Sequence, residues 1–443
     1  MDVIVKETAT FDREITIRIE AGRVNALLDQ EVARLATTAR LPGFRPGKIP
    51  KPVLETRFRD HLSGVIVEKL VQDTYLKALA DHHLQPVDHE PRLTLDQVAR
   101  NKDFVYTAHI QVYPTVEPQG YTGLTLTRRH AEITEADVAN VLQQLRTEHA
   151  RFEVEAGRQA LLGDQVLLDF DGRIDGEQFP GGQGSRHTLE LGKGRFIDTF
   201  EEQLVGIAAG EERQVRVTFP DDYRVTELAG KAATFDCTVH EVRARILPPE
   251  DDGLAGLAGL TSGGLAELRI EIDRTLRDQV EKESGKQLRK AILDHLLAAN
   301  VLELPSRLVQ RECRTMAEQA EQEYATQGMK LTDLGIDKAF LASQFVKPAQ
   351  ERITLGLVLG EIAEREQLVL DEAAVEARLE EMSLAYGDRA RAMKKWVRDN
   401  EERMDSVRSA VLEQQVIDWI RHHGTVTEEI CTFDALMGRS TDG

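Results

Sequence analysis

The chain has 443 residues, of which 41% are hydrophobic and 30% are charged, and this length predicts about three domains with sizeable cores. Its 56 Lys and Arg residues are outnumbered by 76 Asp and Glu residues, which gives a formal net charge of −20 at pH 7. Because nucleic acid repels so acidic a chain, any contact with RNA is expected only at a local basic region.

The sequence indicates neither a membrane span nor a disulfide framework. No apolar run reaches the roughly 18 residues that cross a bilayer, and the N-terminus lacks the charged-then-apolar plan of a signal peptide. Cys237, Cys313 and Cys431 are scattered and form no CxxC pair, which argues against a zinc site and for a reducing cytoplasm. No ATP-binding motif and no set of metal ligands is visible, so we expect no cofactor and no metal.

Residues 1–113 are predicted to form a small α+β domain. Glu14–Glu20 alternates apolar and polar side chains, as a half-buried strand does. Apolar residues then recur at helical spacing from Val24 to Leu35 and, in a longer helix, from Val53 to Leu76. Phe104–Tyr113 alternates again, so we expect a second strand there.

The segment Leu41–Pro50, which reads LPGFRPGKIP, separates the two predicted helices. Its three prolines fix φ and withhold amide donors, and its two glycines allow tight turns, so no helix or central strand passes through it. We expect a stiff tip that carries Phe44, Arg45 and Lys48 outward. The simpler interpretation is an ordinary Pro/Gly connection between two helices.

Local charge favours a binding role for this tip. Residues 34–59 contain seven Lys and Arg residues against one acid, Glu55, for a net charge of +6. Such basic patches bind the nucleic-acid backbone by releasing counterions. The cations are Arg34, Arg40, Arg45, Lys48, Lys51, Arg57 and Arg59.

Residues 114–150 are predicted to connect two domains and to contain an amphipathic helix, which begins at Glu135 and ends at Arg151. Residues 151–246 are β-rich, with a hairpin turn at Asp175–Gly176. Within them we predict strands at Gln214–Phe219 and Thr234–Val242 and a short helix at Phe196–Leu204.

The remainder is predicted to be almost entirely helical from about residue 265, after a glycine-rich loop or hinge at Asp251–Gly264. Helices this long and charged suggest extended arms rather than one compact bundle. Apolar spacing predicts a helix at Ile270–Val280, and the segment Leu288–Leu297 continues or follows it. Pro305 opens the next helix. Further helices are predicted at Ile353–Ile362, Val375–Tyr386 and Val407–Ile420.

The motif Gly43-Phe-Arg-Pro-Gly-Lys-Ile-Pro50 resembles the ribosome-docking motif of the trigger factor family, roughly Gly-Phe-Arg-x-Gly-x-x-Pro. Every fixed position matches, and chain length and domain order agree with the family. The resemblance implies docking at the exit tunnel of the large ribosomal subunit, with Phe44 against ribosomal protein and the cations against rRNA phosphate or acidic side chains. The implied docking residues are Gly43, Phe44, Arg45, Pro46, Gly47 and Lys48.

The chain has 14 Phe and 7 Tyr residues, and seven of these aromatic residues lie within 170–235. Their spacing alone predicts the core of a β-domain. However, the motifs Asp169-Phe-Asp-Gly172, Leu191-Gly-Lys-Gly-Arg-Phe-Ile197 and Phe219-Pro-Asp-Asp-Tyr223 resemble FKBP-type peptidyl-prolyl isomerases. Carried over by position, the resemblance implies a proline pocket lined by Phe170, Phe179, Phe196, Ile197, Phe200, Tyr223 and Phe235.

Such a pocket suits the chemistry of prolyl isomerisation. Rotation about an X-Pro bond meets a barrier of roughly 20 kcal/mol, and it needs neither a nucleophile nor a metal. A dry aromatic bowl binds the proline ring and favours the twisted amide, which is less polar than the planar one. Three departures from the family pattern, His187, Pro180 and Asp198–Thr199, leave the pocket expected but put its catalytic efficiency in question.

Together the two resemblances imply a multidomain α+β fold. An N-terminal α+β docking domain would span residues 1–113, and an FKBP-like domain of sheet and helix would span 151–246. Residues 114–150 and 247–443 would supply a linker and an extended, all-helical C-terminal chaperone domain. Nascent and unfolded polypeptides would be clients. The family further implies a cytoplasmic location, a link to cell division, a homodimer away from the ribosome and no membrane partner.

Three functions remain open. We predict an ATP-independent chaperone that docks at the ribosome, shelters nascent chains and isomerises prolyl bonds as a secondary activity. The second is a proline isomerase whose other domains only deliver substrate. The third is a free cytosolic holdase that never uses the ribosome.

Overall fold

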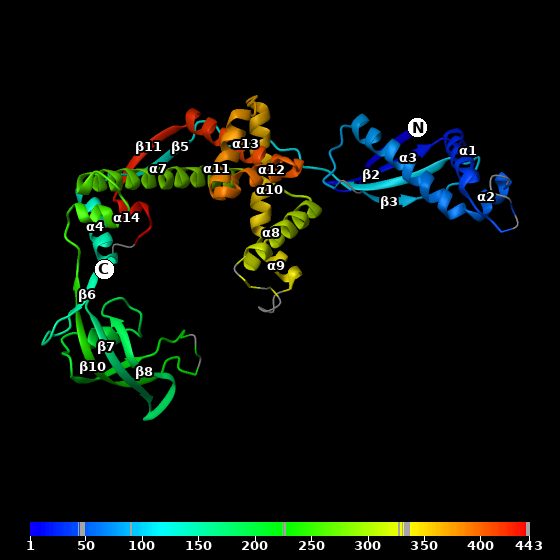
Figure 1. Cartoon of the computed structure of the whole chain (residues 1–443). Helices are drawn as coiled ribbons and strands as arrows, with labels where there is room; N and C mark the ends of the chain where they lie inside the picture. The colour runs from blue at the N-terminus through cyan, green and yellow to red at the C-terminus, as the bar shows by residue number, and fades with distance from the viewer. Residues whose placement is uncertain are drawn as a thin grey trace. The chain divides into compact units, whose positions relative to one another are not determined.

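The chain forms two compact units in the computed structural model, and Figure 1 colours it by residue number. The first combines Met1–Thr127 with Gln287–Thr427, and the second combines Arg128–Lys286 with Glu428–Gly443. The structure describes residues 1–42, 44, 49–88, 91–223, 225, 227–326, 328–329, 331 and 337–439.

The first unit begins with a four-stranded antiparallel sheet in the order β1-β2-β4-β3. The strand predicted at 14–20 is confirmed as β2, and the one predicted at 104–113 as β4. The two outer strands were not predicted. The bounds are β1 Asp2–Glu7, β2 Asp12–Ile19, β3 Arg92–Leu95 and β4 Phe104–Gln111.

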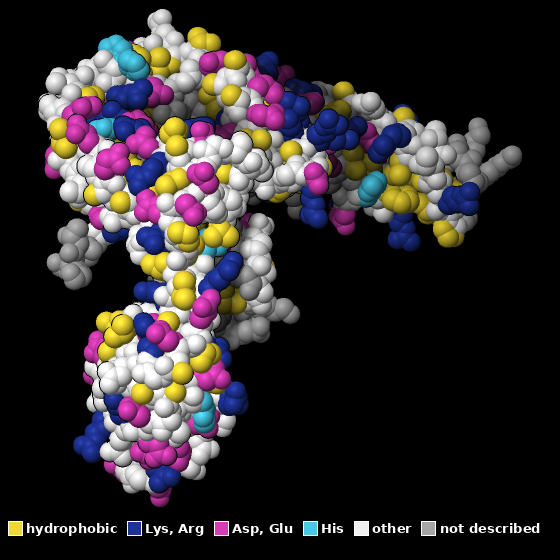
Figure 2. Space-filling view, turned by 60° about the vertical axis from the view of Figure 1, so that its left-hand side comes forward, with side chains coloured by type: hydrophobic (Ala, Val, Ile, Leu, Met, Phe, Trp, Pro, Cys, Tyr) yellow, Lys and Arg dark blue, Asp and Glu magenta, His cyan; other side chains and the backbone are white. Residues whose placement is uncertain are grey.

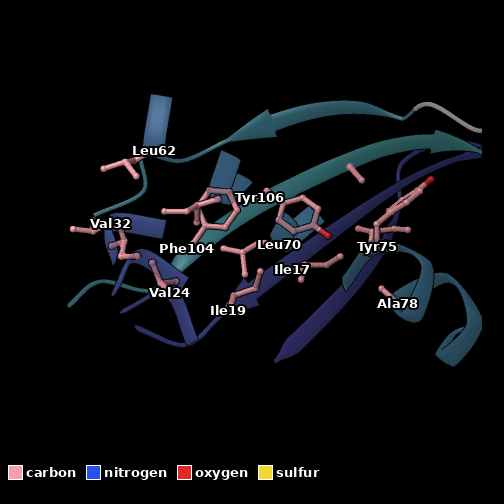
Figure 3. Close-up of a cluster of buried hydrophobic side chains, with 14 of the residues drawn as sticks. Ile17, Ile19, Val24, Val32, Leu62, Leu70, Tyr75, Ala78, Phe104 and Tyr106 are labelled. Atoms are coloured by element: carbon pink, nitrogen blue, oxygen red, sulfur yellow. The ribbon is translucent and has the colours of Figure 1, made fainter. Parts of the chain in front are cut away.

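Helices α1 (Ala21–Thr38) and α3 (Arg59–Asp81) share one hydrophobic core with this sheet. Figure 3 shows Leu70 of α3 beside Ile19 of β2 and the rings of Phe104 and Tyr106, all fully buried or nearly so. The Tyr106 hydroxyl is satisfied inside this core by the Thr74 hydroxyl at 2.8 Å. The core therefore combines dense apolar packing with a paired polar group, as burial requires.

The longer helix predicted from Val53 to Leu76 is in fact interrupted. Helix α2 (Lys51–Arg57) ends at Phe58, whose φ of −112° and ψ of 24° leave the helical region before α3 begins. The break turns the chain so that Leu54 on one side and Leu62 on the other are both buried in the same core. Apolar periodicity alone did not reveal it.

The C-terminal part of the first unit is largely helical, as predicted. The apolar segment Ile353–Ile362 lies within α10, and its residues Val358 and Ile362 are fully buried, so it forms core rather than an exposed client surface. The helices are α8 Ser306–Thr326, α9 Lys338–Gln344, α10 Val346–Arg365, α11 Glu372–Leu384, α12 Ala390–Arg398 and α13 Glu401–His423, with a 3-10 turn at Gly387–Arg389.

The second unit contains a five-stranded antiparallel sheet, in which β6, β10, β7 and β8 follow one another and β9 also pairs with β10. The predicted hairpin turn is confirmed: Asp175 and Gly176 both have positive φ and join β7 to β8. The strands are β6 Arg151–Val154, β7 Gln165–Ile174, β8 Glu177–Glu190, β9 Glu212–Thr218 and β10 Ala232–Ile246.

Several local predictions for this half of the chain need correction. The helix predicted at 196–204 is only the single turn α5 (Phe200–Gln203), because the left-handed φ of 68° at Thr199 interrupts a helix at that point. The predicted glycine-rich loop contains α6 (Asp252–Leu257), whose first turn is capped by the Asp251 carboxylate. The helix predicted to end at Arg151 is α4 (Glu135–Glu148).

Two further findings concern segments that cross the boundary between the units. The apolar segment at 288–297, predicted to continue or to follow the helix at 270–280, continues it: both lie in one helix, α7 (Gly264–Ala299). The largely helical C-terminal region includes a strand, β11 (Thr425–Cys431), which pairs with β5 (Thr125–Ala131), and ends in α14 (Phe433–Leu436). Across the described ranges, we find no helix with the length and apolar character needed to cross a membrane.

The surface carries mixed charge. Figure 2 shows cationic and acidic side chains interspersed over most of the face that it presents, with hydrophobic side chains scattered among them. Because both signs are mixed on this face, basic regions have to be located residue by residue.

Candidate functional site

An aromatic pocket of about 510 Å³ opens on the second unit. Six of the seven predicted pocket residues line it; Phe200 does not. It also includes Phe219 and Leu228, which sequence reasoning did not place there, although Phe219 lies in the quoted Phe-Pro-Asp-Asp-Tyr motif. The full lining is Phe170, Phe179, Pro180, Gly181, Arg195, Phe196, Ile197, Asp198, Phe219, Pro220, Tyr223, Val225, Leu228 and Phe235.

The rings contact one another mainly edge to face. Phe170 lies 5.7 Å from Phe196 and 6.1 Å from Phe235, and Phe179 lies 6.0 Å from Phe235, as ring-centroid distances. The Tyr223 ring packs 4.8 Å from Phe219 at the rim. Because every ring of the wall except Tyr223 contacts at least two others, the wall of the pocket is preformed.

Phe200 lies beneath this wall. Its side chain is fully buried, 4.9 Å from the Phe196 ring and 5.3 Å from the Phe235 ring. Phe235 is also nearly buried but still lines the pocket, whereas Tyr223 is 37% exposed. The predicted set therefore contains residues that can touch a ligand and one that supports them from the core.

The loop that presents Phe196 and Ile197 is anchored by Glu201. The buried Glu201 carboxylate accepts hydrogen bonds from the backbone amides of Gly192 (2.7 Å), Gly194 (3.0 Å), Arg195 (2.8 Å) and Phe196 (3.2 Å). Burial alone would raise the pKa of this carboxyl, but the four amides outweigh it and hold the pKa below its ordinary value. An ionised Glu201 thus fixes the pocket wall through its backbone.

The departures from the family pattern lie around this loop. Thr199 has a φ of 68°, a left-handed conformation that a β-branched residue adopts only with strain. The exposed His187 ring lies 5.4 Å from Phe196 and 5.9 Å from Phe170, outside the pocket lining, while Pro180 is part of it. The substituted positions therefore alter the backbone and the rim and leave the aromatic floor in place.

The pocket offers apolar and hydrogen-bonding contacts together. Apolar rings line much of its volume of about 510 Å³, and the Tyr223 phenol at the rim brings a hydroxyl that can donate a hydrogen bond to a peptide carbonyl. Such a pocket can bind an X-Pro segment and desolvate its amide.

The second candidate site is the segment between α1 and α2 in the first unit. Of its predicted docking residues, Gly43, Arg45, Pro46, Gly47 and Lys48 lie outside the described residues. Phe44 is described: its side chain is 40% exposed, and its amide donates to the carbonyl of Leu41 at 3.1 Å. Ala39 before the segment and Ile49 after it are both buried in the domain core.

An ion-pair network beside this segment joins the two helices that flank it and neutralises a nearby acid. Arg100 bonds to Asp29 of α1 at 2.8 Å and to Glu55 of α2 at 2.7 Å, so it joins the two helices and neutralises the one acid of the basic region. The bond from Arg100 holds the pKa of Asp29 below its ordinary value. Among the described residues, the exposed cations Arg40, Lys51, Arg57 and Arg59 have no ion-pair partner.

Comparison with known proteins matches three family models to this chain. The model for FKBP-type peptidyl-prolyl cis-trans isomerases matches residues 156–240, so the second unit carries an isomerase domain of this class. Models for the bacterial trigger factor protein (TF) and its C-terminus match residues 1–145 and 264–422.

Two curated relatives match along their whole length. The trigger factor of Magnetococcus marinus is 39% identical over 441 residues, covering 99% of this chain and 100% of the relative. That of Shewanella halifaxensis is 34% identical over 441 residues, covering 100% and 99%. The chain therefore belongs to the trigger factor family, a family of chaperones with an FKBP-type domain.

A solved structure, reported with work on "promiscuous substrate recognition in folding and assembly activities of the trigger factor chaperone", has a TM-score of 0.52 to this chain. The two sequences are 19% identical, and the alignment covers 95% of this chain and 99% of the chain in that structure. The likeness supports the overall fold class, and the exact domain boundaries stay predictions.

Proposed function

We propose that this chain is an ATP-independent chaperone that docks at the exit tunnel of the large ribosomal subunit and shelters nascent chains. Phe44 would contact ribosomal protein, and Arg45 and Lys48 would meet rRNA phosphate or acidic side chains. The observation that carries the proposal is Phe44, a large apolar side chain left 40% exposed on a segment whose two ends are buried. An exposed aromatic in a basic surround marks a binding surface better than a structural turn.

The same proposal includes cis/trans isomerisation of prolyl bonds as a secondary activity in a cytoplasmic protein. It is supported by the match to the FKBP-type model and by the preformed aromatic pocket. Unfolded polypeptides would be the clients, and self-association away from the ribosome would compete with docking.

Ribosome docking is tested by co-sedimentation with purified large subunits. Wild-type protein should pellet with them, and the variant Phe44→Ala/Arg45→Ala/Lys48→Ala should stay in the supernatant, with binding that weakens as salt rises. Equal pelleting of both would move docking to another surface. If neither pelleted, a free isomerase or holdase would be the better account.

The isomerase activity is tested by the refolding of a client whose slow step is prolyl isomerisation. Tyr223→Ala should lower kcat/KM by about two- to tenfold, because it removes one aromatic contact at the rim. Tyr386→Ala makes the same change at a tyrosine outside the pocket and should leave the rate unchanged. If wild-type protein failed to accelerate refolding, the chaperone proposal would stand without the enzymatic one.

A further inference from the structure

A second basic segment lies far from the docking segment in the sequence, at residues 389–398. These ten residues contain five Lys and Arg residues and no acid, in a chain whose acids outnumber its bases by 76 to 56. They form the end of a 3-10 turn and the helix α12 in the first unit. The five are Arg389, Arg391, Lys394, Lys395 and Arg398.

Neighbouring acids neutralise two of these cations. Lys394 bonds to Glu380 and Arg398 bonds to Glu376, both on α11. Arg389, Arg391 and Lys395 are exposed, and the described part of the chain offers them no ion-pair partner. Three cations without an ion-pair partner in the described ranges therefore lie at this surface, between the exposed acids Asp388 and Asp399. We call this surface the α12 basic face.

The side chain of Trp396 lies next to these cations in the sequence, and a second arginine holds its ring in place. Arg391 and Lys395 are one helical turn apart on α12, and the exposed Trp396 follows Lys395 directly in the chain. Trp396 is 57% exposed, and the Arg403 guanidinium lies 3.6 Å from the ring centroid. Arg403 also donates to the Trp396 carbonyl at 2.8 Å, which fixes the guanidinium and thereby holds the ring in place.

Trp396 thus combines an exposed ring, held by Arg403, with neighbouring cations that have no ion-pair partner among the described residues. Tyr386, in the turn before α12, is likewise 55% exposed. Aromatic rings next to Lys and Arg match the chemistry of single-stranded nucleic acid, in which bases stack and phosphates attract cations. An acidic peptide would satisfy the cations but would leave the indole face without a partner of matching shape.

We propose that the α12 basic face binds single-stranded RNA, with phosphates at Arg389, Arg391 and Lys395 and a base stacked on Trp396. This site is separate from the docking segment and does not depend on ribosome docking through Phe44. It would give the chain a second point of contact with RNA despite its net charge of −20.

The test uses the full chain and a fluorescein-labelled 12-mer of oligouridylate, followed by fluorescence anisotropy between about 50 and 200 mM salt. The variant Arg389→Ser/Arg391→Ser/Lys395→Ser should bind about tenfold more weakly or worse, and its salt slope should fall by about 2, since each single-strand phosphate contact contributes about 0.7. Far-UV circular dichroism should match that of the wild type.

A matched control removes three other exposed cations. Arg274, Lys286 and Lys290 on α7 are 70–77% exposed, so Arg274→Ser/Lys286→Ser/Lys290→Ser changes the net charge equally. This control should retain the wild-type salt slope. Repeating both titrations with the Phe44→Ala/Arg45→Ala/Lys48→Ala changes already present separates the two basic sites, and the α12 effect should persist there.

Stacking has its own readout. The chain has two tryptophans, and Trp419→Phe leaves Trp396 as the one intrinsic reporter. Oligouridylate should quench its fluorescence, and a 12-mer of polyglutamate should not. The proposal is overturned if the α12 and α7 variants bind RNA alike, or if polyglutamate binds as tightly as RNA without quenching, which would make this a surface for acidic peptides.

Discussion

Phenylalanine serves the two candidate sites in opposite ways. In the FKBP-type domain, Phe170 contacts both Phe196 and Phe235, and Phe200 supports those two rings from the core. In the N-terminal domain, Phe44 stands outside the core while Ala39 and Ile49 anchor the chain on either side. The pocket thus depends on packing for its shape, whereas the docking segment presents a side chain that the fold does not need.

This difference predicts how mutations should act. A substitution among the buried rings of the aromatic pocket should change stability and binding together, because the same rings provide both. A substitution at the exposed docking residue should change binding alone. The following experiments test that separation, from the largest expected effect to the smallest.

Phe200→Ala should lower the stability of the isomerase domain by about 3–5 kcal/mol, because it removes a fully buried ring and leaves a cavity. Urea unfolding of the full chain should show an early transition that wild-type protein lacks. The more exposed Tyr223→Ala should shift this transition much less while still slowing isomerisation. Equal stability losses in the two variants would contradict the placement of Phe200 beneath the pocket wall.

Glu201→Gln should cost about 2–3 kcal/mol, because the neutral amide cannot accept from all four backbone amides. The folded-state pKa of Glu201 lies below the ordinary value of 4.5, so its stabilisation is present above that value and is lost as pH falls through the folded pKa. The stability gap between wild type and variant should therefore be constant above that value and should narrow as pH falls below it.

Glu202→Gln provides the control for this experiment, since Glu202 is the exposed neighbour of Glu201. It should leave the acid dependence unchanged. A gap that stayed constant with pH for Glu201→Gln would show that the carboxylate does not hold the loop in its ionised form.

Thr199→Gly should raise stability by about 0.5–1 kcal/mol. Glycine adopts the observed φ of 68° without strain, and this gain exceeds the extra backbone entropy that glycine loses on folding. Thr199→Ala keeps the Cβ atom and removes the same hydroxyl, so it separates relief of strain from loss of the Gln203 hydrogen bond. Thermal unfolding should rank the glycine variant first. If alanine stabilised as much as glycine, strain at Thr199 would not be the cause.

Phe44→Ala should change stability by less than about 0.5 kcal/mol, because its side chain lies at the surface. Its effect should appear in ribosome binding instead. A large stability loss here would remove the contrast with Phe200 and would favour a structural role for the docking segment.

The fold was predictable wherever burial has a regular period. β2 alternates Ile15, Ile17 and Ile19 into the core, and the helical C-terminal region repeats its apolar residues. β11 was missed because all but its last residue are exposed and give no alternation. The break at Phe58 and the short α5 depend on local bonds and dihedral angles that apolar periodicity does not encode.

The candidate sites were predictable in a different way. The motifs identified the aromatic residues of the pocket, but they could not show that Phe200 is buried beneath it and Phe219 lines it. The role of Glu201 depends on four backbone amides, and the partner of Glu55 is Arg100, 45 residues further along the chain. Such contacts require the fold itself.

Photo-crosslinking from position 44 tests the central claim most directly. A benzoylphenylalanine placed at Phe44 should crosslink to a component of the large ribosomal subunit. The same group at Leu76 should not, since Leu76 is 69% exposed near the other end of α3, a helix about 34 Å long. Crosslinks from Leu76, or from neither position while the protein still pellets with ribosomes, would contradict docking through the segment that carries Phe44.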